Sequence, residues 1–148
     1  MPWFGDYGIL YYRTDLLKKY GYKAPPTTWG DLFKMAKKIQ DGEQKTNPNF
    51  AGFVFQGNSY EGLTCNALEW IASAGGGHMI DNGKASINNT RRRHDPGRDP
   101  RPGRQDHATR RDLLPGVTQT EHAFDSGDAA FARNWPYQYG IGATPARR

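Results

Sequence analysis

The alternation of apolar and polar positions over residues 1–89 predicts strands and helices in turn. Residues 7–12 (YGILYY) are apolar and β-prone, which is typical of a strand. The short stretch DLLKKY follows; Thr14 is its expected helix cap and Gly21 its stop. An extended link through Pro25 and Pro26 then separates this helix from the next.

The second helix has the clearest pattern. Thr28 followed by Asp31 resembles a capping box with Asp in the usual place of Glu. Lysines occupy the opposite, outer face. Five apolar side chains recur at helical spacing: Trp29, Leu32, Phe33, Ala36 and Ile39.

Three further elements complete this first region. Residues 52–56 (GFVFQ) predict a buried strand, and residues 60–74 (YEGLTCNALEWIASA) a buried helix that Gly75–Gly77 ends. Residues 81–84 (DNGK) predict a turn before a short strand, ASIN. The order of strands and helices indicates an α/β fold.

The character of the chain changes at residues 90–122. The stretch 90–111, TRRRHDPGRDPRPGRQDHATRR, has Ala108 as its one apolar side chain besides proline. It cannot bury enough surface to offset the entropy of ordering, so we expect it to be disordered by itself. Order is expected again over 123–142, where 123–133 is partly apolar and 134–142 (NWPYQYGIG) is aromatic and turn-like; residues 143–148 form a tail.

The net charge of +5 belongs to this odd stretch. Residues 1–89 hold nine basic and eight acidic side chains, whereas residues 90–111 hold eight Arg and three Asp. A nucleic-acid-binding module through 91–111 is therefore one hypothesis, but it rests on charge alone, which supports non-specific binding. No aromatic residues are interleaved with the arginines. We therefore expect no nucleic-acid partner.

Several other classes lose support from the composition. One cysteine, Cys65, excludes an internal disulfide, and the four His have no metal-ligand spacing, so neither a metal nor a cofactor is expected. Gly75–Gly77 lacks the Gly-Lys-Ser/Thr of a phosphate loop. No apolar window is long enough to span a membrane, no signal peptide is visible, and no nucleophile–base set indicates an enzyme.

Two separated stretches carry a family resemblance. LYYRTDLLKKYG, the Pro-Pro-x-x-Trp after it, and AAFARNWPY occur in that order, within residues 2–89 and about 123–142. Together they resemble the extracellular solute-binding proteins of ABC importers, of the maltose/trehalose type. The resemblance implies part of a periplasmic-binding-protein type II fold, mainly its second lobe, with a sugar held in the cleft between two lobes.

The resemblance also implies partners and a location. Such a protein captures a mono- or oligosaccharide, here maltose- or trehalose-like, and delivers it to the membrane subunits of an ABC permease. We expect a monomer, and a parent protein that is periplasmic or extracellular and membrane-anchored. A chain holding one lobe would supply one wall of the cleft.

Residues 90–122 depart from the family pattern, which has a helix and then a W-x-G-x-I-x-P-x-G-V-like loop there. We interpret the segment as a local frameshift. The codons for residues 103–111, read one base later, permit Gly-Lys-Ile-Thr-Pro-Pro-Gly-Val, and the frame would return between Asp112 and Ala123.

Sugar capture needs polar groups for the hydroxyls and aromatic planes for the C–H faces of the ring. By resemblance, Phe4 and Asp6 match positions that face the cleft, with Asp6 taking sugar hydroxyls; a turn at a strand entry is the alternative for Asp6. Tyr60 and Glu61 match an aromatic and an acid in the cleft, although a helix N-terminus favours Glu without any ligand. Gln56 is a weaker candidate.

The segment NWPY provides the best stacking candidates. By resemblance, Trp135 or Tyr137 covers a sugar face; the alternative is that one packs in the core while the other is exposed. Trp3, Trp29 and Trp70 are expected to be structural. A glycan-acting enzyme remains an alternative function, for which Asp6 and Glu61 are the one acid pair to consider, and it would need these carboxyls about 5–10 Å apart.

Overall fold

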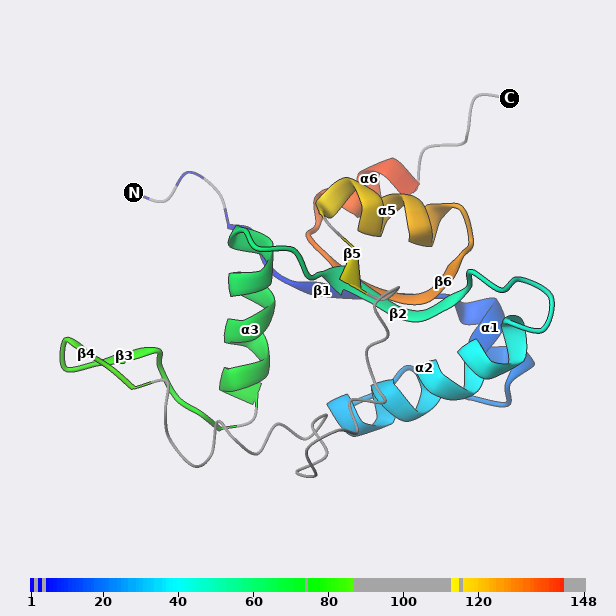
Figure 1. Ribbon diagram of the computed structural model, residues 1–148, viewed down its shortest axis with the longest axis horizontal. Coiled ribbons are helices and arrows are strands. Elements are labelled where there is room, and N and C mark those ends of the chain that lie inside the picture. Colours follow the sequence, from blue (N-terminus) through cyan, green and yellow to red (C-terminus); the bar gives the residue numbers. More distant parts are fainter. Residues whose placement is uncertain (2, 4, 74, 87–112, 115, 143–148) are drawn as a thin grey trace.

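The computed structural model describes residues 1–148 except 2, 4, 74, 87–112, 115 and 143–148 (Figure 1). The stretch 90–111, expected to be disordered, therefore lies outside the described residues. The elements are β1 (Ile9–Tyr12), α1 (Thr14–Lys19), α2 (Trp29–Glu43), β2 (Ala51–Gln56), α3 (Glu61–Ser73), β3 (Ile80–Asp81), β4 (Lys84–Ala85), β5 (Leu113–Leu114), α5 (Val117–Asp125), β6 (Ala129–Asn134) and α6 (Tyr137–Gly142).

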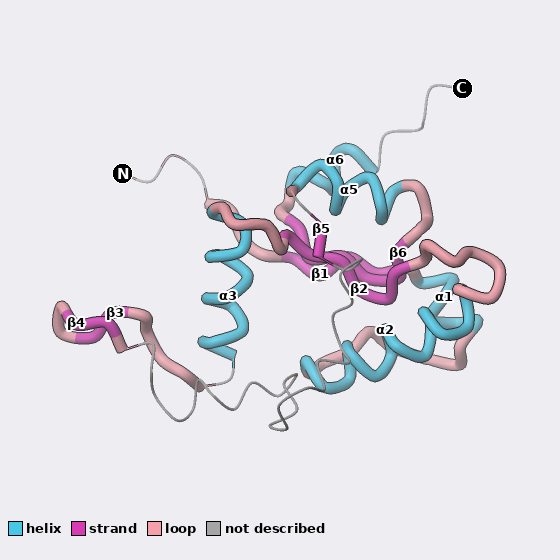
Figure 2. Tube along the Cα trace, viewed as in Figure 1, coloured by secondary structure: helices cyan, strands magenta, loops and turns pink. Residues whose placement is uncertain are grey.

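A four-stranded sheet in the order β1-β6-β2-β5 organises the chain. The strands β6, β2 and β5 are parallel, and β1 is antiparallel to β6, with Ile9 opposite Asn134. Helices α1 and α2 lie on one side of the sheet and α5 and α6 on the other, whereas α3 stands beside it (Figure 2). The sheet covered by helices on both sides confirms the α/β prediction.

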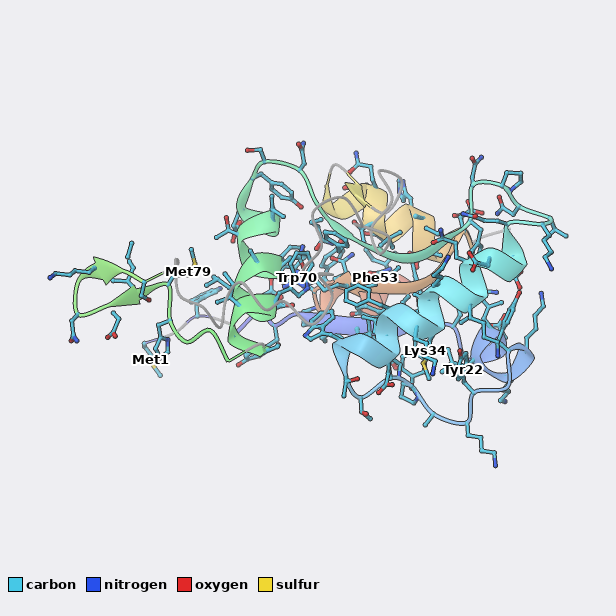
Figure 3. All side chains as sticks on the ribbon, turned by 60° about the horizontal axis from the view of Figure 1, so that its bottom comes forward. Met1, Tyr22, Lys34, Phe53, Trp70 and Met79 are labelled. Atoms are coloured by element: carbon cyan, nitrogen blue, oxygen red, sulfur yellow. The ribbon has the colours of Figure 1, made fainter. Side chains whose placement is uncertain are left out.

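The core divides between the two faces of the sheet. On the α2 side, Phe53, Phe55 and Phe131 pack with the apolar stripe of α2, and Trp70 of α3 reaches the same cluster. Figure 3 shows Trp70 and Phe53 between α3 and α2. On the α5 side, Val54 and Ala132 form a smaller cluster. Every residue of β2 and of β6 is buried, which is expected of central parallel strands.

The predicted start of α2 is confirmed. Thr28 caps the helix because its Oγ1 accepts a hydrogen bond from the backbone N–H of Asp31 at 3.1 Å. Of the predicted inner face, Leu32, Ala36 and Ile39 are buried, and Trp29 and Phe33 pack against the core from its margin.

A turn also forms where DNGK predicts it. Asn82 and Gly83 adopt positive φ angles of 48° and 73° between β3 and β4. This is the backbone that a tight two-residue hairpin requires.

Some local predictions are wrong. Arg13, not Thr14, occupies the N-cap of α1, and no side chain caps that helix. Helix α3 is only partly buried, because its fully covered residues are Gly62 and Asn66 while Leu68 is 40% exposed. Trp3 is 95% exposed, so packing gives it no structural role.

The C-terminal part is more regular than predicted. Helix α5 crosses the boundary placed between 122 and 123, and the aromatic stretch expected as a turn contains helix α6. Within α5, Thr120 is fully buried. No helix in the described part of the chain is long and apolar enough to cross a membrane.

Candidate functional site

The topology brings the predicted site residues toward one edge of the sheet. Gln56 ends β2 and Asn134 ends β6, and because these strands are parallel, their carboxyl ends meet at the same edge. Strand β1 is antiparallel, so its first residue, Ile9, lies at that edge too. In open α/β sheets, ligands bind at the carboxyl ends of the strands. Phe4 lies outside the described residues.

The turn after β6 is fixed by hydrogen bonds. The side-chain oxygen of Asn134 accepts from the backbone N–H of Trp135 at 3.0 Å, and its amide nitrogen donates to the Tyr137 hydroxyl at 3.2 Å. Asn134 is fully buried, so the surrounding side chains fix the position of its amide group. Trp135 and Tyr137 are therefore held together, with Tyr137 42% exposed.

A buried cation lies beneath the Trp135 ring. The Arg133 guanidinium carbon is 4.2 Å from the centroid of that ring, within cation–π range. Arg133 also forms an ion pair with Glu69 of α3, including a hydrogen bond from Nε to Oε2 at 3.2 Å. The side chain of Arg133 is 4% exposed and that of Glu69 33%.

Gln56 lies at the centre of a buried network and not on an open wall. Its Nε2 donates to the backbone oxygen of Arg133 at 2.9 Å, and its Oε1 accepts from Arg133 Nη1 at 3.3 Å. Asn66 of α3 donates Nδ2 to the backbone oxygen of Gln56 at 2.9 Å. Gln56 is fully buried, so this geometry supports a role in fixing strand ends to α3.

Tyr60 lies next to this network. Gly62 is buried, and a Cβ added there would collide with the Tyr60 ring and come 2.9 Å from Cβ of Gln56. Tyr60 is 38% exposed, and burial raises the pKa of its hydroxyl. The ring thus covers the end of β2 with one part open to solvent.

Asp6 and Glu61 are the least connected of the predicted residues. Both are exposed, and neither side chain makes a hydrogen bond or ion pair with the described residues. Glu61 is the first residue of α3, where the helix dipole favours an acid in any case. The structure thus brings Gln56, Tyr60, Trp135 and Tyr137 to the same edge of the sheet. Asp6 and Glu61 remain exposed carboxylates with no hydrogen bond or ion pair to the described residues.

A pocket of about 670 Å³ lies on the α2 side of β1. None of the predicted site residues that the structure describes lines it, but Glu69 and Arg133 of the network do. No cluster of metal-ligating side chains occurs in the residues with defined positions.

Sequence reasoning missed Arg133, Glu69, Asn66 and Asn134. The available signal was Arg133, the single charged residue in the strand AAFARN. A buried charge needs a partner, so that pattern predicts an acid from another element.

Comparison with known proteins identifies the family. Residues 1–146 match the family described as bacterial extracellular solute-binding protein. The chain belongs to this family. A probable ABC transporter-binding protein of Deinococcus radiodurans is 51% identical over 96% of this chain and 34% of its own length.

Solved structures agree with this assignment. The maltose-bound T. maritima MalE3 matches 98% of the chain and 36% of its own length, with a TM-score of 0.78 and 36% identity. Two more distant solute-binding proteins show the fold alone. One, from Thermotoga lettingae with α-D-tagatose, is 19% identical with a TM-score of 0.74 over 96% of this chain and 36% of its own. The other, from Agrobacterium radiobacter with ribitol, is 24% identical with a TM-score of 0.68 over 95% and 34%.

These matches confirm the expected fold class. The chain has part of the periplasmic-binding-protein type II fold and spans about a third of the length of the solute-binding proteins that it matches.

Proposed function

We propose that this chain forms one wall of a sugar-binding cleft in the substrate-binding component of an ABC importer. The observation that carries the proposal is the set of partly exposed rings, Tyr60, Trp135 and Tyr137, at the carboxyl edge of the sheet, where part-buried hydrogen bonds hold the turn of Trp135 and Tyr137. Flat rings fixed in this way suit the C–H faces of a sugar, and carboxylates such as Asp6 and Glu61 suit its hydroxyls. A second lobe would close over the sugar.

The ligand that we propose is a maltose- or trehalose-like saccharide. The support is the bound maltose in the T. maritima structure, which is 36% identical to this chain. The partners would be the membrane subunits of the permease, and the parent protein would work, as a monomer, in the periplasm or outside the cell. We propose that the protein is not catalytic. An assay for reducing ends tests this, and none should be released from maltose, trehalose or longer glucans.

Saturation-transfer NMR on the full chain tests this function, since the method detects the millimolar binding expected of a single wall. Magnetisation should pass from the protein to maltose or trehalose, and Trp135→Ala should abolish the transfer. Tyr12→Ala is the matched control, because Tyr12 is an exposed aromatic at the far end of β1, opposite Phe131. No transfer to any saccharide from a chain with native near-UV circular dichroism would contradict the proposal.

We further infer that residues 90–122 include a stretch translated from a shifted reading frame that returns close to residue 113. The support is that β5 pairs in register with β2 and that α5 follows with a buried Thr120, so family-like packing begins again there. Nucleotide sequence of the gene tests the idea. A shifted frame that restores no apolar helical pattern over this stretch would contradict it.

A further inference from the structure

The charged side chain Arg133 is placed where an apolar one would be expected. It points from strand β6, in which every residue is buried, to the α2 side of the sheet. A buried guanidinium is costly unless its charge and its N–H groups are satisfied. Here Glu69 supplies the charge partner and Gln56 supplies a further acceptor. A buried guanidinium with two dedicated partners at the end of a strand calls for an explanation beyond stability.

The partners fix the plane of the guanidinium. Nε and Nη2 both bond to the Glu69 carboxylate, and Nη1 bonds to Gln56 Oε1 at 3.3 Å. Two directions of hydrogen bonding in one plane leave the group little freedom to rotate. Its flat face is then free to stack on the Trp135 ring, 4.2 Å away.

Close packing preserves this arrangement. Gly8, just before β1, passes the ion pair so closely that an added Cβ would collide with the Glu69 carboxylate and come 2.8 Å from Arg133 Nη2. The ion pair thus has a wall formed by backbone on one side and the Trp135 ring on the other.

We propose that Arg133 is the positioning residue of the sugar site: held by Glu69 and Gln56, it covers one face of Trp135 and so sets the orientation in which the ring meets the sugar. The inference rests on the proposed function. Trp135 has no hydrogen bond from its own side chain in the described structure, so the guanidinium and the backbone of the turn determine where its ring lies.

Fluorine NMR of the full chain labelled with 5-fluorotryptophan tests the positioning without any ligand. The chain has four Trp, and Trp135→Phe identifies the resonance of Trp135. Arg133→Lys keeps the positive charge but loses the planar fork, so the Trp135 resonance should move or broaden while the other three stay. Glu69→Gln, which changes a more exposed partner, should give a smaller change in the same resonance. An unmoved Trp135 resonance in Arg133→Lys would overturn the inference.

Sugar binding then separates this inference from the function on which it rests. With wild-type chain, binding of maltose or trehalose by saturation transfer is expected, and Arg133→Lys should weaken it about tenfold, or 1.4 kcal/mol. Arg13→Lys is the matched control, because Arg13 is paired with Asp15 outside the site, and it should change neither readout. Wild-type binding that persists unchanged in Arg133→Lys overturns the positioning role alone. Absence of binding by the wild-type chain overturns the proposed function, and with it the role assigned to Arg133.

Discussion

The Tyr11 hydroxyl donates a hydrogen bond of 2.9 Å to the backbone oxygen of Trp135, joining two residues 124 positions apart. Strand β1 thereby holds the turn that carries the stacking candidates. Tyr11 is half-buried and its ring packs against Phe124, so the hydroxyl can be removed while the ring packing is kept.

Tyr11→Phe should lower the free energy of unfolding by about 1 kcal/mol, because a part-buried carbonyl loses its donor while the ring packing is kept. Urea unfolding followed by circular dichroism measures the change. Tyr12→Phe is the control, since Tyr12 is exposed on the same strand and has no such bond. Equal losses in the two variants would show that the bond to Trp135 contributes nothing.

Asn66→Ala should destabilise the chain more strongly, by about 1–3 kcal/mol. Asn66 is fully buried and donates to both oxygens of Gln56, so truncation removes two hydrogen bonds from buried acceptors. Asn58→Ala, which removes an exposed amide just before α3, should cost much less. The same urea titration compares them, and a cost for Asn58→Ala as large as that for Asn66→Ala would contradict the network's role.

Two glycines should respond to alanine with opposite signs. A Cβ on Gly52, in β2, would collide with the backbone oxygen of Ala36, so Gly52→Ala should destabilise by about 1–3 kcal/mol. On Gly30, in the first turn of α2, a Cβ would meet only Thr28 Oγ1 at 3.9 Å. Gly30→Ala should therefore stabilise by up to about 1 kcal/mol, because alanine favours the helix. Thermal unfolding measures both, and two shifts of the same sign would show that α2 and β2 are packed differently.

Much of the fold could be predicted because local signals and burial agree. The helix from Trp29 has both a capping residue and a continuous apolar stripe, and the strand that ends at Gln56 is apolar up to that last residue. The segment from Asn134 gave a misleading local signal, because asparagine, proline and glycine are typical of turns. Its helix α6 depends on tertiary contacts that no local pattern encodes, such as the bond from Gln138 Nε2 to Asp125 Oδ1 at 3.3 Å.

The candidate site was predictable only in its outer layer. Aromatic residues such as Tyr60 and Trp135 could be proposed from their chemistry and the family resemblance. The support beneath them could not, because Arg133 and its partner Glu69 are 64 positions apart and meet only through the fold. For the same reason Gln56, chosen as a ligand residue, is found inside the network.

Tyr137 should titrate late. Burial, opposed by the hydrogen bond from Asn134 and reinforced by the nearby Glu121, raises the pKa of its hydroxyl from 10.0 to about 12. The folded chain therefore favours the neutral phenol, and the stability this adds is complete below pH 10 and is lost as the pH rises through the folded pKa of about 12. Phenolate absorbance should show a tyrosine ionising near pH 12 in the wild-type chain that is missing in Tyr137→Phe, and Tyr139→Phe should retain it. If Tyr137→Phe keeps the full late absorbance change, the Tyr137 hydroxyl is not shielded from water in the folded chain, and the turn carrying Trp135 is open to solvent.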